Sequence, residues 1–176
     1  YGVGNSWHDV FGMDGPLARI DVLDEEGERL ETVFTRAADG RLTGITFPNQ
    51  VTDSYYTSTD KATIDDEGQI LKIEEEYSYE SGSWDDDPNY NGEDYSYYGY
   101  FATEYTWENG QVVKTYVTDK YENTVNGETN SGEWHETSRY TYGDGKVTFS
   151  TYDGDGQSPS STTVIEEQGN MRKVHH

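Results

Sequence analysis

Short runs of aromatic and β-branched residues recur along this chain, and a glycine that follows an acidic residue or an asparagine separates most of them. Residues 138–152 are the clearest example, because Asp144-Gly145 divides two such runs. Glycine adopts positive φ at no steric cost, so this pattern is typical of the tight turn in a β-hairpin. The same reasoning predicts turns at Gly27, Gly40, Gly68, Gly110, Gly145 and Gly169.

These turns predict an all-β fold. About ten strands lie between and around them, and no segment shows helical periodicity of useful length. Consecutive hairpins imply an antiparallel meander. A long meander must protect its edge strands, so we expect a closed or nearly closed barrel in preference to an open curved sheet. We assign residues 1–15 to a loosely ordered N-terminal arm and residues 16–174 to a single β domain, with polar insertions near residues 81–96 and 123–132.

Residues 70–79 show the clearest alternation of apolar and polar side chains. A period of two is typical of a strand with one dry face and one wet face. The residues expected on the dry face are Leu71, Ile73, Tyr77 and Tyr79, with Glu75 interrupting them. Those expected on the wet face are Lys72, Glu74, Glu76 and Ser78.

Composition and charge exclude several kinds of partner. The chain has 35 acidic and 12 basic residues, a net charge of −23 that repels nucleic acid and anionic membrane surfaces. It has no apolar run of about 18 residues, which a membrane-spanning helix needs. It contains no cysteine, so no disulfide stabilises it. Only 28 residues are Leu, Ile, Val or Phe, so the 16 tyrosines and 4 tryptophans must supply much of the core.

One short segment resembles a known repeat. Residues 39–45 (DGRLTGI) resemble the tyrosine-aspartate repeats of large secreted toxin shells, and residues 67–73 and 109–114 are looser copies. The irregular spacing of the turn glycines more closely resembles secreted or lipid-anchored β-meander proteins of unknown function from gram-negative gut anaerobes. Some of those proteins have a porin-like sheet or barrel. The resemblance implies an all-β fold and a periplasmic, cell-surface or extracellular location, and it assigns no catalytic residue.

An acidic stretch at residues 85–94 contains half of a calcium-binding pattern. Asp87, Asn89 and Asn91 alternate before Gly92, as in the first half of a calcium loop. Tyr98 stands where the bidentate carboxylate of such a loop belongs, so a solvated acidic loop is the favoured interpretation. If calcium binds, the expected ligands are Asp85, Asp87, Asn89, Asn91 and Glu93.

Aromatic residues concentrate around the same stretch. Exposed rings beside polar groups are suited to ligand binding, including stacking on sugars. The candidate ligand-binding residues are Trp84, Tyr95, Tyr97 and Tyr98. The alternative is that half of the rings face the core and the rest shield strand edges.

These observations favour an exported, non-catalytic module of the cell envelope or surface, which binds a glycan or protein or has a structural role. One alternative is a glycan-active enzyme with paired carboxylates, whose separation of about 5–9.5 Å a structure would reveal. Another is an extracellular calcium-binding domain. No nucleophile elbow and no nucleotide-binding motif occurs, so we assign no catalytic residue.

Overall fold

β-Strands make up most of this computed structural model, which describes residues 18–23, 27, 29–48, 50–52, 56–80, 95–143, 145–154, 156–168 and 171–175. These residues form twelve strands, and no helix occurs among them. The strands are β1 Arg19–Leu23, β2 Arg29–Arg36, β3 Leu42–Thr46, β4 Val51–Thr52, β5 Tyr56–Ile64, β6 Ile70–Glu80, β7 Tyr95–Glu108, β8 Gln111–Val125, β9 Glu128–Gly143, β10 Lys146–Asp153, β11 Ser161–Gln168 and β12 Met171–His175. The all-β expectation is confirmed.

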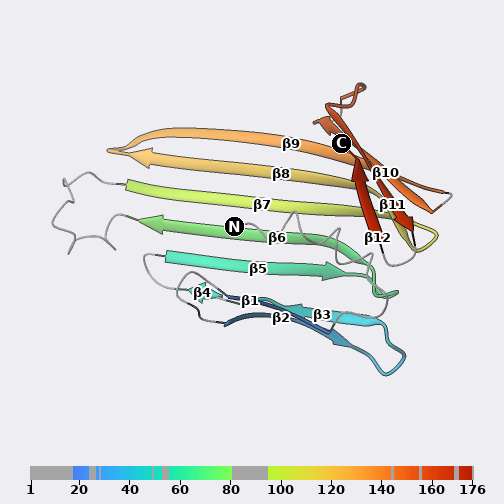
Figure 1. The fold of residues 1–176 in the computed structure, drawn as a ribbon. Coiled ribbons are helices and arrows are strands. Elements are labelled where there is room, and N and C mark those ends of the chain that lie inside the picture. The colour runs from blue at the N-terminus through green and yellow to red at the C-terminus, as the bar shows by residue number, and fades with distance from the viewer. Residues whose placement is uncertain are drawn as a thin grey trace.

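The strands form two antiparallel sheets. One sheet contains β1, β2 and β3, and the other contains β4 to β12. Within each sheet every strand pairs with its neighbours in the chain, as Figure 1 shows. The predicted antiparallel meander is therefore confirmed. The longest strands, β7, β8 and β9, lie in the middle of the larger sheet and determine its length.

The larger sheet is open along the described strands. Its order runs from β12 to β4, and no pairing joins these two end strands within the residues that the structure describes. In Figure 1, β10 to β12 turn across one end of the long strands, and β1 to β3 lie beside β5. The expected closed or nearly closed barrel is thus not confirmed. The physical reason is that β4 has only two residues, too short a ladder to close on another edge.

The predicted turns are confirmed wherever the structure describes them. Each of the five described glycines lies between two strands and has positive φ: Gly27, Gly40, Gly68, Gly110 and Gly145. The sixth position, Gly169, lies outside the described residues.

The polar stretch at residues 123–132, which we expected as an insertion, is the tip of the β8–β9 hairpin. Asn126 and Gly127 have φ of 50° and 81°, as in the two-residue turns that suit hairpins. The strand ladder continues up to this turn through pairs such as Asn123 with Asn130. The expected arm at residues 1–15 and residues 81–94 of the other insertion lie outside the described part of the chain.

The hydrophobic core joins the two sheets at one end of the long strands. Its buried residues are Phe34, Leu42, Phe47, Ile70, Tyr105 and Val112. The first three come from the β2–β3 region, and the others come from β6, β7 and β8. The indole of Trp107 donates a hydrogen bond of 2.7 Å to the Ile70 carbonyl oxygen, which adds a polar contact beside this core.

The predicted faces of β6 are only partly correct. Leu71 is 40 % exposed, whereas its neighbour Ile70 is 1 % exposed. Ile64 pairs with Ile70 and Thr63 with Lys72, so Leu71 is the extra residue of a β-bulge. The bulge shifts the alternation by one residue, which moves Ile70 rather than Leu71 to the core face. After the bulge, the two faces of β6 differ little in burial, because most side chains on the predicted dry face and on the predicted wet face are half-buried.

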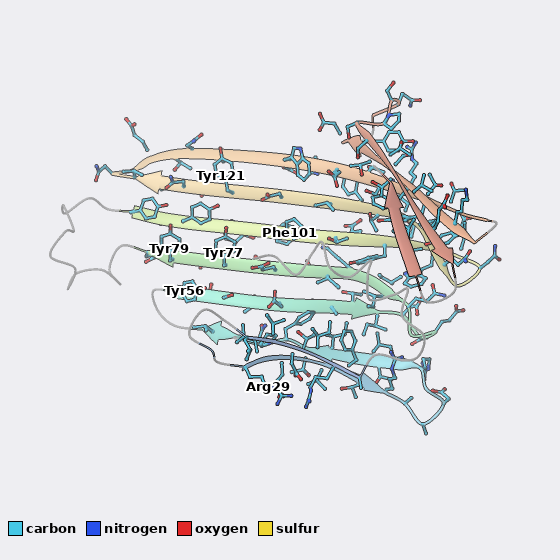
Figure 2. The ribbon with its side chains drawn as sticks, in the orientation of Figure 1. Arg29, Tyr56, Tyr77, Tyr79, Phe101 and Tyr121 are labelled. Atoms are coloured by element: carbon cyan, nitrogen blue, oxygen red, sulfur yellow. The ribbon has the colours of Figure 1, made fainter. Side chains whose placement is uncertain are left out.

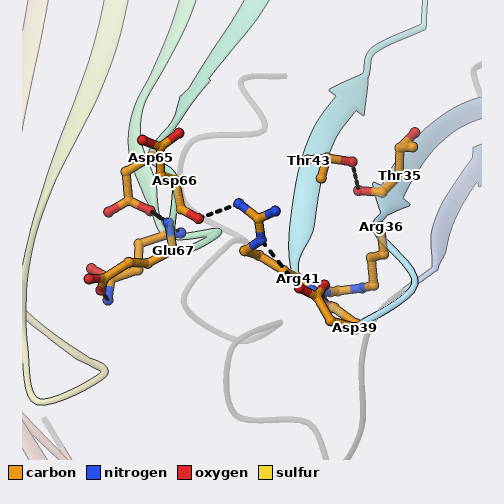
Figure 3. Close-up of polar contacts among 10 residues, drawn as sticks. Thr35, Arg36, Asp39, Arg41, Thr43, Asp65, Asp66 and Glu67 are labelled. Atoms are coloured by element: carbon orange, nitrogen blue, oxygen red, sulfur yellow. Dashed lines mark hydrogen bonds and ion pairs between the residues drawn. The ribbon is translucent and has the colours of Figure 1, made fainter.

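Two turns also hold the sheets together. The Arg41 guanidinium donates a hydrogen bond to the Asp66 carbonyl oxygen, and its Nε lies 3.7 Å from Asp39 Oδ2 (Figure 3). The same arginine lies against Gly68 in the β5–β6 turn, because a Cβ built on Gly68 would be 2.5 Å from Arg41 Cγ. The β2–β3 turn and the β5–β6 turn are therefore in close contact.

Candidate functional site

Two rows of residues cross strands β5 to β9 on one face of the larger sheet. Residues directly opposite each other on antiparallel strands point to the same face. The first row is Tyr56, Tyr79, Tyr97, Asn123 and Asn130. The second row is Ser58, Tyr77, Gly99, Tyr121 and Gly132. Figure 2 shows the labelled tyrosines of these rows in the half of the long strands away from β10–β12.

We call these ten residues the uncharged band. None of them has an acidic or basic side chain, although the chain as a whole has 35 acidic and 12 basic residues. The band contains only tyrosine, asparagine, serine and glycine. It lies away from the core, since the buried core residues Ile70 and Val112 are at the opposite ends of β6 and β8.

The tyrosine rings of the band contact one another. Tyr77 and Tyr79 both stack on Tyr97, with ring centroids 5.5 Å apart in each pair. Tyr79 also contacts Tyr95, and their hydroxyl oxygens are 3.0 Å apart. The Tyr77 hydroxyl donates a longer hydrogen bond, of 3.4 Å, to that of Tyr97. These contacts make one continuous aromatic layer over β6 and β7.

Two glycines allow tyrosine rings to lie against the strand backbone. A Cβ on Gly99 would be 2.5 Å from Cε1 of Tyr77, and a Cβ on Gly132 would be 2.5 Å from Cε1 of Tyr121. Neither glycine has positive φ, so the requirement is for the absence of a side chain. Each tyrosine ring therefore lies over the glycine that pairs with it on the neighbouring strand.

Substitution of Gly99 by alanine is expected to destabilise the protein by about 1–3 kcal/mol, because the new methyl group displaces the Tyr77 ring. The matched control is Gly143→Ala in β9, where φ is also not positive and a Cβ would meet nothing within 4 Å. That change is expected to alter stability by no more than about 0.5 kcal/mol. Urea unfolding of both variants checks this. If Tyr77→Ala does not abolish the effect of Gly99→Ala, the explanation is wrong.

The hydroxyl groups of Tyr77 and Tyr79 remain protonated at ordinary pH. Burial and the hydrogen bond with Tyr95 raise the pKa of Tyr79 to about 12. The hydrogen bond with Tyr97, together with burial, also raises the pKa of Tyr77. Because neither phenol ionises near neutral pH, both can donate as well as accept hydrogen bonds.

A third row, next to the band on the side of the core, is acidic. It comprises Asp60, Glu75, Phe101, Asp119 and Trp134. Burial and the neighbouring carboxylate of Glu75 raise the pKa of Asp60 to about 6, although a hydrogen bond from Gln50 opposes this shift. Three carboxyl groups thus flank the uncharged band.

The opposite face of the same strands is a network of charged and polar groups. The Tyr98 hydroxyl donates to Glu76 Oε1 at 2.6 Å, and the Tyr100 hydroxyl donates to Glu74 Oε1 at 2.9 Å. Lys72 Nζ lies 2.7 Å from the same Glu74 oxygen. The tyrosine hydroxyls on this face therefore bind carboxylates, whereas those of the aromatic layer contact each other.

The structure separates the aromatic residues that the sequence grouped together. Tyr97 belongs to the band and Tyr95 contacts it, but Tyr98 points to the opposite face because successive strand residues alternate. Trp84 lies outside the described residues. Sequence reasoning did not assign Tyr56, Tyr77, Tyr79 or Tyr121 to a binding site. The alternation of aromatic residues along a strand indicates which of them share a face. The sequence does not give the register between strands, which decides which tyrosines lie side by side.

The candidate calcium ligands cannot be placed. Asp85, Asp87, Asn89, Asn91 and Glu93 all lie outside the described residues. Within the ranges that the structure describes, no group of three or more His, Cys, Asp or Glu side chains is arranged to hold a metal ion. The calcium expectation therefore remains a prediction.

Comparisons of the chain with protein-family models, with curated proteins and with solved structures found no match. The resemblance to secreted β-meander proteins of gut anaerobes therefore stays an expectation. The described residues include no helix of the length and apolar character that crossing a membrane requires. The fold and the band together define an antiparallel meander that is open along its described strands and has an aromatic, uncharged band on one face.

Proposed function

We propose that this protein is a non-catalytic module, exported to the cell envelope or surface, that binds a glycan on the uncharged band. The observation that carries the proposal is the set of tyrosine rings in the band, two of which are well exposed. Tyr56 is 42 % exposed and Tyr121 is 39 % exposed. Tyrosine combines an apolar ring with a polar hydroxyl, and a sugar likewise combines an apolar C–H face with hydroxyl groups.

The composition of the band favours a glycan over a protein partner. Stable protein interfaces contain an apolar core, commonly with methionine or arginine beside the aromatic residues. The band has no aliphatic, methionine or arginine side chain. Its phenol and amide groups instead suit a ligand that presents many hydroxyl groups.

A glycan-active enzyme is the second candidate, supported by one observation. Asp60 and Glu75 lie directly opposite each other on the same face as the band. The raised pKa of Asp60, about 6, is of the kind that a general acid needs, while Glu75 would supply the second carboxylate. If the protein releases new reducing ends from a bound glycan, and Glu75→Gln abolishes this release, the enzyme hypothesis is correct and the binding-module hypothesis is wrong.

The test compares two equally exposed tyrosines on opposite faces. Tyr121→Ala is expected to weaken binding of a neutral soluble polysaccharide about tenfold, because it removes one ring from the band. Tyr98 is 38 % exposed on the other face, and Tyr98→Ala is expected to leave the affinity unchanged. Calorimetric titration against a panel of neutral polysaccharides provides the measurement. Absence of binding to every member, or equal losses in the two variants, would exclude glycan binding on this face.

A further inference from the structure

We infer that the ligand is an uncharged, unbranched glycan chain that lies across the strands, along the row from Tyr56 on β5 to Asn130 on β9. This inference rests on the proposed function and adds the class and direction of the ligand. Three features of the described residues carry it: the shape of the uncharged band, the charges beside it, and the polar groups at one end.

The uncharged band is long across the strands and narrow along them. It covers five neighbouring strands, which corresponds to about 19 Å at a spacing of 4.7–4.9 Å between strands. Along each strand it covers only two residues of the face, which are about 7 Å apart. A chain that followed β7 toward the core would pass over Phe101, which has Glu75 on one neighbouring strand and Asp119 on the other. A chain that lies across the strands along the row stays clear of these carboxylates, and a branch toward the core would project over the acidic row.

The charges beside the band determine which glycans can bind. Toward the core, the next residues on the same face include Asp60, Glu75 and Asp119. On the other side the next residues are Tyr95, Val125 and Glu128, so the one carboxylate among these three residues lies at the tip of the β8–β9 hairpin. Carboxylates on both sides repel a chain of uronic acids or sulfated sugars, and unfavourable contacts of this kind select against the wrong partner. A neutral chain meets no such opposition.

The two ends of the row differ in chemistry. Toward β5 the row consists of the rings of Tyr56, Tyr79 and Tyr97, and toward β9 it ends in the amides of Asn123 and Asn130. Both asparagines line a hollow of about 540 Å³ at the β8–β9 tip. The buried Oδ1 of Asn123 has no hydrogen-bond partner among the described residues. The amide end can therefore bind hydroxyl groups of a chain whose ring faces stack on the tyrosines.

Binding of neutral linear gluco-oligosaccharides of increasing length tests the direction. The affinity is expected to rise with length until the chain spans about 19 Å and then to level off. Tyr56→Ala and Asn130→Ala, at the two ends of the row, are each expected to weaken binding of the longest oligomer at least fivefold. The control is Trp134→Ala, which lies four residues along β9 from Asn130 in the acidic row and is expected to leave the affinity within twofold.

A polyuronate of matched length tests the charge selection. It is expected not to bind the native protein at low salt, and Glu75→Gln combined with Asp119→Asn is expected to allow binding. Preference of the native protein for the polyuronate would overturn the inference. So would a loss in Trp134→Ala without a loss in Tyr56→Ala, although both results leave glycan binding itself intact. If no oligosaccharide or polysaccharide binds, the proposed function fails and the inference fails with it.

Discussion

Replacement of Gly68 by alanine is expected to destabilise the protein by about 2–5 kcal/mol, which combines backbone strain with overpacking. The backbone at Gly68 has φ of 84°, a conformation that a residue with a Cβ rarely adopts. An added Cβ would also lie 2.9 Å from the backbone nitrogen of Leu42 and 2.5 Å from Arg41 Cγ. Leu42 cannot easily move away, because its side chain is buried in the core between the two sheets.

The matched control for this change is Gly110→Ala. Gly110 has φ of 75°, but a Cβ there would meet nothing within 4 Å. Its substitution therefore reports backbone strain alone, expected at about 1–2 kcal/mol. Urea unfolding measures the loss in free energy of unfolding for each variant. The difference between the two losses reports the close contact between the β2–β3 and β5–β6 turns. Equal losses in the two variants would show that this approach does not hold the sheets together.

Truncation of Ile70 to alanine is expected to cost about 2–5 kcal/mol, because it leaves a cavity at the centre of the shared core. Ile70 belongs to the same buried cluster as Phe34 and Leu42 of the smaller sheet. Leu71 is the neighbouring residue in the bulge and is 40 % exposed. Leu71→Ala is therefore expected to cost about 1 kcal/mol or less.

Thermal or urea unfolding of these two variants distinguishes the observed register from the one that the alternation of β6 predicts. If Leu71→Ala destabilises the protein as much as Ile70→Ala, the bulge at Leu71 is misplaced. The core face of β6 would then be the one that the sequence alone suggests.

Local patterns predicted the turns because a turn depends on few residues. Gly27, Gly40, Gly68, Gly110 and Gly145 all have positive φ between strands, as expected from the residues beside them. The antiparallel order of the strands follows from the same turns, since each short connection forces the chain back beside the preceding strand. The number and order of strands were therefore predictable in outline.

The faces of the strands were less predictable because bulges shift the alternation. Leu71 in β6 is one such position. In β8, Trp107 pairs with Val112 while Thr106 pairs with Lys114, so Val113 is a second extra residue. The bulge places both Val112 and Thr115 on the core face, although their spacing of three does not fit a regular strand. Nothing in the local sequence marks either valine as the extra residue.

The uncharged band required information that no single strand contains. Tyr97 and Tyr98 are adjacent in sequence, but alternation sends them to opposite faces. Tyr56 and Tyr79 are distant in sequence, but the register of β5 on β6 places them side by side. The glycine under a tyrosine ring, as with Gly99 and Tyr77, is likewise a relation between two strands.

The sequence by itself determined an all-β meander, the positions of its turns and the shortage of aliphatic core residues, because these depend on local conformation and on composition. Only the tertiary structure decided that the larger sheet stays open along its described strands, that Ile70 rather than Leu71 enters the core, and that ten uncharged residues form one band. The physical reason is that register, bulges and edge pairing depend on contacts between strands, and the residues in each such contact are distant from each other in the sequence.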